Sequence, residues 1–299
     1  MPEQFEKPIP SKKWWITVLL KERQHQLELG VEMGGATASS PQAASHSSPK
    51  TGASMRKIVF YQAALVVGLF VAWEVFVRLG ILPVYLYGQP SGILTKASRL
   101  FLEGDLARDI GATAFASITG FLAGTAIGST AGLLLWLSKT AAAVLRPIIV
   151  AINGVPKIAL APLIVVWFGV GLGAKVAIAA SLTFIVSLIA VYQGTQEVDE
   201  DLVKLMRSLG AKPLTIWRKV IVPGSTPWIL STMRLNIGFA MIGAVVGEYI
   251  SSKMGLGYMI YNAGALYDLN SVFVGIFCLM ALALALDAVL GRIEARFKW

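Results

Sequence analysis

Few residues of this sequence have the chemistry of a catalytic or metal site. Both histidines, His25 and His46, lie in the polar N-terminal region, and the only cysteine, Cys278, lies in an apolar run. The apolar part of the chain therefore has no disulfide partner and no imidazole for metal binding or proton transfer. Serine and acidic residues occur, but without a histidine partner or a nucleophile elbow. We expect no catalytic residues and no metal site.

The sequence also lacks the Gly-x4-Gly-Lys-Ser/Thr motif that cradles nucleotide phosphates. The chain cannot bind and hydrolyse ATP by that device. We therefore expect this chain to bind no cofactor, and any ATP and Mg²⁺ that drive its work to be bound by a partner subunit.

Lys157 stands between Pro156 and Pro162 in an apolar run. A lysine at mid-membrane is too costly to face lipid, so it either reaches a polar pathway or pairs with a carboxylate. Each proline removes a backbone donor, and broken helices persist in membranes where protein or a water-filled cavity satisfies the freed carbonyls. This segment is therefore expected to line a translocation path, with a plain packing kink as the alternative.

Arg234 and Glu248 lie near the two ends of another apolar run. They are fourteen residues apart, or about 21 Å along a helix, and cannot pair directly. Arg234 is expected to extend to the membrane interface. Glu248 is expected either to gate an outer vestibule or to cap a short re-entrant helix.

The elements that carry these residues are predicted to be membrane helices. Only 14% of the residues are charged and 56% are hydrophobic, whereas soluble domains average about 25% charged residues. The net charge of +9 does not indicate nucleic-acid binding, because the basic residues lie between apolar runs rather than in one stripe. The sequence predicts an all-α integral membrane protein with about six spans, at residues 58–79, 110–138, 145–168, 176–194, 227–250 and 272–290.

The remaining parts of the chain differ in composition. Residues 1–55 are predicted to be a disordered or weakly structured polar extension, and Met55 is an alternative to Met1 as the start of translation. Residues 56–299 form the predicted transmembrane domain. With both termini in the cytoplasm, the inner segments carry about twice as many Lys and Arg as the outer ones, which favours this orientation. The longest inner loop is then residues 195–225, between spans four and five.

Small residues recur every four positions in the second predicted span, at Gly120, Gly124, Gly128 and Gly132, after Ala112 and Ala116. On a helix they form one ridge that lets a neighbouring backbone approach closely. The ridge is expected to pack inside one subunit, and an interface between subunits is the alternative.

The inner loop has the pattern of two short amphipathic helices. Leu202, Leu205, Met206 and Leu209 form an apolar stripe, and Gly210 is suited to end the helix. A second segment, residues 213–222, ends at Pro223. Periodicity alone allows either a docking knob for a soluble partner or an ordinary loop.

This loop resembles the cytoplasmic coupling loop of binding-protein-dependent ABC importer permeases. That family's pattern is Glu-Ala-Ala, three residues, Gly, nine residues and Ile-x-Leu-Pro, and Gly210, Val220, Val222 and Pro223 match its spacing. Two further stretches, 155–169 and 248–258, look like the nitrate/sulfonate/taurine branch, as does the closing Trp299. The resemblance covers residues 57–299 in order. It assigns the coupling loop to Lys204, Leu205, Met206, Arg207, Leu209, Gly210, Ala211, Val220, Val222 and Pro223.

The sequence departs from the family pattern at two places. Lys204-Leu205-Met206 replaces Glu-Ala-Ala, which reverses one charge and puts in doubt the ionic contact that the glutamate makes with the ATPase. Ala116 stands where the branch often has an arginine.

The resemblance implies a permease subunit that forms the translocation path of an ATP-driven importer in the bacterial inner membrane. Its expected partners are cytoplasmic ATPase subunits, a periplasmic or lipid-anchored binding protein and a second permease copy. The expected substrate is a small solute, anionic and similar to a sulfonate, nitrate or taurine, while bicarbonate and pyrimidine- or flavin-like compounds stay open. The alternative is a self-sufficient secondary transporter, which would usually show internal repeats and charged relay residues at mid-membrane.

Overall fold

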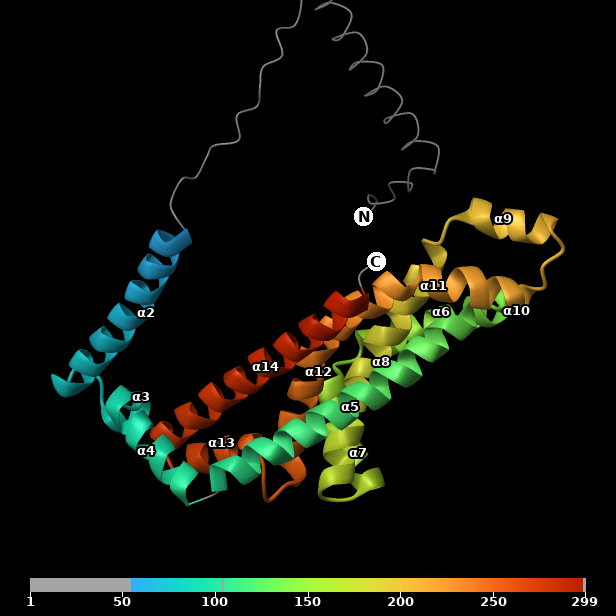
Figure 1. Ribbon diagram of the computed structural model, residues 1–299. Helices are drawn as coiled ribbons and strands as arrows, with labels where there is room; N and C mark the ends of the chain where they lie inside the picture. Colours follow the sequence, from blue (N-terminus) through green and yellow to red (C-terminus); the bar gives the residue numbers. More distant parts are fainter. Residues whose placement is uncertain (1–54, 104, 298–299) are drawn as a thin grey trace, which may run out of the picture. The chain divides into compact units, whose positions relative to one another are not determined.

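The computed structural model describes residues 55–103 and 105–297, and every regular element within them is a helix (Figure 1). The expectations for the polar extension, the alternative start and Trp299 concern residues that lie wholly or almost wholly outside this range. Contacts between residues divide the chain after Val59, and the following description concerns the unit from Phe60 onward. The elements are α2 (Met55–Arg78), α3 (Val84–Tyr87), α4 (Pro90–Leu102), α5 (Asp105–Leu135), α6 (Lys139–Gly154), η1 (Lys157–Leu160), α7 (Ala161–Phe168), α8 (Leu172–Gln196), α9 (Glu200–Ser208), α10 (Pro213–Ile216), η2 (Trp217–Ile221), α11 (Val222–Gly224), α12 (Thr226–Ser251), α13 (Leu256–Ala265) and α14 (Leu269–Phe297).

Five described helices, α2, α5, α8, α12 and α14, are long and apolar enough to cross a membrane. A sixth span is obtained if α6 and the helices that follow it are taken as one broken crossing. This count confirms the predicted all-α membrane fold. The short helices α3 and α4 were not predicted, because their apolar runs are below the length of a span. Helix α13 lies where one alternative for Glu248 expected a short capped helix, and the Gly257 amide in its first turn donates to Glu248.

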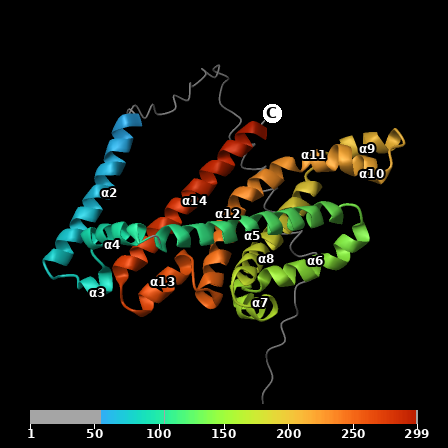
Figure 2. The same ribbon diagram turned by 60° about the horizontal axis from the view of Figure 1, so that its bottom comes forward.

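The third predicted span is not one continuous helix over residues 145–168. The chain bends by 87° between α6 and the η1–α7 pair, as Figure 2 shows where α6 leads into α7. Pro156 precedes the 3-10 turn η1, and Pro162 lies in the first turn of α7, where a missing N–H costs nothing. Proline therefore breaks the span at one position and starts a new helix at the other.

The core of the bundle is built on α8, which contacts both α5 and α12. The small-residue ridge of α5 faces α8, and the two helices run parallel. A Cβ atom added to Gly124 would overlap the Ala180 carbonyl oxygen and the Thr183 hydroxyl, and one added to Gly132 would lie 2.7 Å from the Leu188 carbonyl oxygen. The ridge thus brings two backbones together inside this chain. Ala116, on the same helix, is fully buried.

The other side of α8 packs equally closely on α12. A Cβ atom added to Gly243 would lie 2.5 Å from the Cα of Ala179, and one added to Gly247 would lie 2.8 Å from the Cα of Lys175. Between the three helices, the buried Asn236 amide donates to the hydroxyls of Thr125 at 2.9 Å and Ser187 at 2.6 Å. This polar contact links α12 to α5 and α8.

Candidate functional site

The α9–α11 segment (Glu200–Gly224) is held by local caps and one left-handed turn. Asp199 accepts a hydrogen bond from the Asp201 amide at 2.8 Å and so caps the start of α9. At the other end Gly210 has φ of +77°, and the Ala211 amide donates to the Met206 carbonyl at 3.0 Å. Glycine adopts this conformation without strain, so the chain reverses directly after α9.

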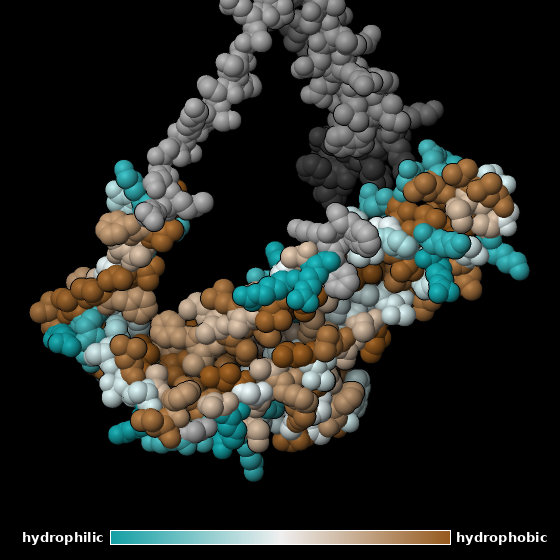
Figure 3. All heavy atoms as spheres, in the orientation of Figure 1, coloured by the Kyte–Doolittle hydropathy of each residue, from teal (hydrophilic) through white to brown (hydrophobic). Residues whose placement is uncertain are grey.

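The apolar side of α9 faces away from the bundle. Leu202, Leu205 and Leu209 are 50%, 55% and 73% exposed. Figure 3 shows apolar atoms, in brown, gathered over this helix at the upper right. The predicted stripe is therefore the accessible face, with the half-buried Met206 beside it.

The opposite side of α9 carries Glu200, Val203, Lys204 and Arg207, which line a cavity against the bundle. Lys204 lies 3.0 Å from an oxygen of Asp201 and 3.5 Å from one of Glu200. The hydrogen bond to Asp201 and the charge of Glu200 raise the pKa of Lys204 above its usual value. Lys204 therefore stays charged and is engaged within its own helix.

The second half of the segment is one helical run, from α10 through the π-helical turn η2 to α11. Ile216 is 1% exposed and Ile221 is fully buried, so the run is anchored in the bundle. The indole of Trp217 donates to the Leu133 carbonyl at 2.8 Å, close to the end of α5. Val220 and Val222 are half-buried and Pro223 is exposed. The run leads directly through Ser225 into α12, so the segment connects α9 to two core helices.

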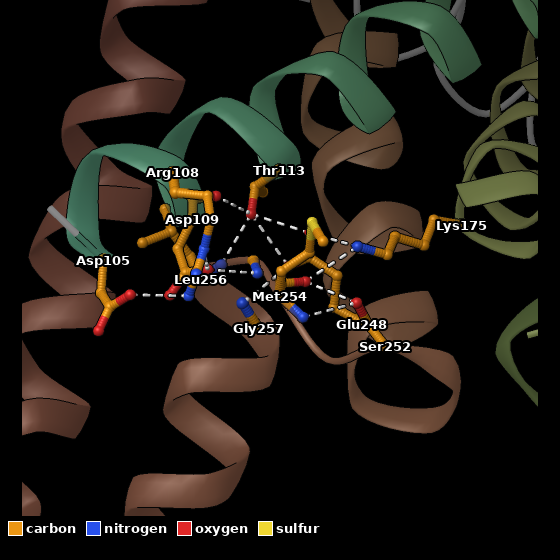
Figure 4. A network of polar contacts seen from close by, with 11 residues as sticks. Asp105, Arg108, Asp109, Thr113, Lys175, Glu248, Ser252, Met254, Leu256 and Gly257 are labelled. Carbon is orange, nitrogen blue, oxygen red and sulfur yellow. Dashed lines mark hydrogen bonds and ion pairs between the residues drawn. The ribbon is translucent and has the colours of Figure 1, made fainter. Parts of the chain in front are cut away.

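At the opposite ends of these helices lies a buried polar network (Figure 4). Glu248 of α12 is fully buried, Lys175 of α8 is 3% exposed, and the ammonium lies 3.5 Å from the carboxylate. Thr113 of α5 donates to the same carboxylate at 3.0 Å, and the Gly257 amide donates to it at 2.8 Å. The carboxylate therefore joins three long helices to the first turn of α13.

The loop before α13 is bound to the same network. The Lys175 ammonium donates to the Met254 carbonyl at 2.9 Å, and the Gly255 amide donates to Asp109 at 2.8 Å. Gly255 has φ of +115°, and a Cβ atom there would overlap the carboxylate of Glu248. Any larger residue would displace the loop.

The predicted pathway and gating residues do not form a single site. Lys157 lies near the break after α6 and donates to the Asn153 side chain at 3.1 Å, not to a carboxylate of the described residues. Arg234 pairs with Glu294 at 2.9 Å and with Asp287 at 3.5 Å, both on α14. Pro156, Lys157 and Pro162 thus form one group at the break, and Arg234 and Glu248 lie at opposite ends of α12.

Sequence reasoning missed Lys175, Asp109 and Thr113. Lys175 falls one residue before the predicted fourth span, residues 176–194, whereas the structure places it in the first turn of α8. One signal was available, because the start of the fourth span and the end of the fifth meet when two consecutive spans are antiparallel. A lysine and a glutamate at those two ends are therefore candidates for a pair. Within residues 55–103 and 105–297, no cluster of three or more His, Cys, Asp or Glu residues could hold a metal ion.

Comparison with known proteins identifies the family. The family model described as "Binding-protein-dependent transport system inner membrane component" matches residues 124–299. A protein of Brucella melitensis named as an ABC transporter permease is 34% identical, over 70% of this chain and 86% of its own length. A Bacillus subtilis permease named for aliphatic sulfonate transport is 31% identical, over 76% of this chain and 83% of its own.

The fold also matches a solved transporter. The structure is the inward-facing MetNI methionine ABC transporter, with a TM-score of 0.60 and 20% identity, over 66% of this chain and 98% of the matched chain. Permeases of this family are not themselves enzymes and work with a separate ATPase and a binding protein. The chain belongs to the family of binding-protein-dependent transport system inner membrane components and is a permease subunit of an ABC importer.

Proposed function

We propose that the apolar face of α9 is the surface on which the ATPase docks. The observation that carries this proposal is the exposure of Leu202, Leu205 and Leu209, on an amphipathic helix whose charged side is turned toward the bundle. An apolar stripe left open beyond the spans is a typical protein interaction site. The short helix would lie in a groove of the partner, and ATP and Mg²⁺ would be bound there rather than by this chain.

The charge reversal at Lys204 fits this arrangement. Lys204 lies on the cavity side of α9 and pairs with Glu200 and Asp201. We propose that these pairs within the helix take the place of the family's ionic contact at this position. We propose that leucines supply the contact with the ATPase in this chain.

Force on α9 would reach the core by two routes, one along the covalent chain and one through a hydrogen bond. The Gly210 turn passes movement to the helical run, which continues into α12. The Trp217 indole passes it to the end of α5 through the Leu133 carbonyl. Closure of the ATPase would thus move α5 and α12 together and switch the access of the pathway.

The docking proposal is tested by co-purification of the ATPase with a tagged permease. Leu205→Asp places a charge in the apolar contact and should reduce ATPase recovery by about tenfold or more, because burying an unpaired charge costs several kcal/mol. Gly210→Trp should act similarly by straining the left-handed turn. Lys253→Asp, on the exposed loop at the other end of α12, is the matched control. Full ATPase recovery with both α9 variants would contradict docking at this face.

We also propose a homodimer in the inner membrane with both termini in the cytoplasm. Exposed apolar side chains on α5 and α6 support a second copy, among them Ile127 at 61% and Val150 at 65%. The Lys and Arg distribution supports the orientation. Native mass spectrometry of the complex should show two identical permeases with two ATPase subunits. A permease without a second copy, or paired with a different permease, would contradict the homodimer.

The proposed substrate is a small anion of the sulfonate type. It is supported by the name of the Bacillus subtilis relative and by the resemblance to the nitrate/sulfonate/taurine branch. Proteoliposomes containing the complete transporter should accumulate labelled taurine or an alkanesulfonate only with ATP and binding protein present. Uptake of an uncharged flavin or pyrimidine in place of the sulfonate would contradict this assignment.

The pathway itself is proposed to pass the break between α6 and α7. Lys157 is only partly buried and lies at that break between Pro156 and Pro162. An anion passing there would meet its ammonium group. Glu248 and Arg234 are both paired with opposite charges, so we propose that they hold the two ends of α12 while the pathway changes access.

A further inference from the structure

A cavity of about 630 Å³ separates α9 from the bundle. Its walls come from the last turns of α5 and α8, from α6, and from the charged side of α9. The apolar face proposed to meet the ATPase is on the other side of α9. The cavity is therefore not filled by the docking contact itself.

The charge of this cavity is strongly unbalanced. Lys139 and Arg146 of α6 and Lys204 and Arg207 of α9 line it, together with one carboxylate, that of Glu200. Lys204 is engaged by Glu200 and Asp201. No ion pair joins Lys139, Arg146 or Arg207 to another residue of the described chain. Three cations from two helices thus face one space, and the single carboxylate in its lining, that of Glu200, is paired with Lys204.

The lining also contains apolar and interfacial residues. Trp136 follows the end of α5, and Tyr192 lies in the last turns of α8, so the cavity is at the depth where two spans end. Trp and Tyr are enriched at that depth, where lipid headgroups meet acyl chains. Leu135 and Ala142 continue the apolar lining beside the cations. A charged group with an apolar extension would satisfy both parts.

We propose that this cavity binds a phosphate-bearing anion at the cytoplasmic membrane surface. Arginine and lysine recognise phosphate oxygens by charge-assisted hydrogen bonds. The mixed lining favours the headgroup of an anionic phospholipid such as phosphatidylglycerol over a free phosphate, because a free ion makes no use of Trp136 and Leu135. A bound headgroup would bridge α6 to α9 and hold α9 at a fixed distance from the bundle.

The test uses the full chain, with its ATPase, in nanodiscs of phosphatidylcholine containing a small fraction of phosphatidylglycerol. Native mass spectrometry after extraction should show phosphatidylglycerol retained on the complex in preference to phosphatidylcholine. Arg146→Gln with Arg207→Gln should lower that retention by about tenfold or more, because both guanidinium groups would donate charge-assisted hydrogen bonds to the phosphate oxygens. Arg292→Gln with Arg296→Gln, at the end of α14, removes the same charge outside the cavity and should leave retention unchanged.

A second arm distinguishes the source of the phosphate. The same variants are titrated with glycerol 3-phosphate in phosphatidylcholine nanodiscs, and the thermal midpoint is followed. Stabilisation by glycerol 3-phosphate without lipid retention would assign the cavity to a free organophosphate and remove the lipid. All four exchanges are at exposed positions, so the variants are expected to fold. Equal behaviour of the cavity double variant and the α14 control in both arms would overturn the proposal.

Discussion

Lys175 and Glu248 form a salt bridge that is buried between helices. Lys175 lies in the first turn of α8, where a cation is unfavourable because the helix N-terminus is itself positive. The pair persists because both groups have further partners: the Lys175 ammonium donates to the Met254 carbonyl, and the Glu248 carboxylate accepts from Thr113. The pair holds the loop before α13 against three helices.

Replacing one partner of this pair should destabilise the protein more than replacing both partners. Lys175→Met leaves the carboxylate of Glu248 without its cation, and the expected loss is about 3 to 5 kcal/mol of unfolding free energy. The double variant Lys175→Met with Glu248→Gln should recover part of that loss, because the amide can still bond Thr113. Thermal unfolding in detergent measures both. Equal losses in the single and the double variant would show that the charges are not coupled.

The hydrogen bond of Trp217 to Leu133 can be removed while an aromatic side chain is kept at this position. Trp217→Phe deletes the hydrogen bond to Leu133 and should cost about 1 kcal/mol of stability. The larger effect is expected on coupling, since the α9–α11 segment loses its bond to α5. Substrate transported per ATP hydrolysed should fall, while ATPase recovery is kept. An unchanged ratio would remove this residue from the coupling route.

Helices α5, α8 and α12 form the rigid element of the molecule because their backbones approach at small residues. In lipid, apolar burial does not drive helix association, so close packing and polar contacts supply it. The ridge on α5 and the two glycines of α12 give α8 such contact on both sides. The Asn236 contacts then set the register of the three helices.

The glycine ridge can be tested with a control on the same helix. A Cβ atom at Gly124 overlaps backbone and side chain of α8, whereas one at Gly111 meets nothing within 4 Å. Gly124→Ala should separate α5 from α8 and sharply lower the unfolding temperature and the yield of folded protein. Gly111→Ala should be neutral or stabilising by about 0.5 to 1 kcal/mol, because alanine favours helix. Similar behaviour of the two variants would contradict the packing.

Length and apolar content predicted the long helices, because these two properties decide whether a segment can span a membrane. Their ends shifted by a few residues, as for α8, which begins at Leu172 rather than 176. The break after α6 followed from Pro156, but its 87° angle depends on packing and could not be predicted. The α9 stripe was found by its period, whereas its outward direction depends on tertiary contacts. The Lys175–Glu248 pair was missed because it joins residues 73 positions apart.

The whole molecule presents two kinds of surface that a single chain leaves open. Apolar side chains cover much of the spans, as expected for contact with lipid and a second copy, and Figure 3 shows them in brown. The apolar face of α9 is different, because it lies beyond the spans, on the segment proposed to dock with the ATPase. Family membership establishes that an ATPase works with this chain, and the proposed docking site for it is the outward face of α9.

The most direct test is a cross-linking scan of α9 in the assembled transporter. A photoreactive residue is placed in turn at Leu202, Leu205 and Leu209 and, on the other side, at Val203 and Arg207. Docking at the apolar face predicts cross-links to the ATPase from the three leucine positions and few or none from the other two. Cross-links to the ATPase from Val203 and Arg207 but not from the leucines would contradict the account.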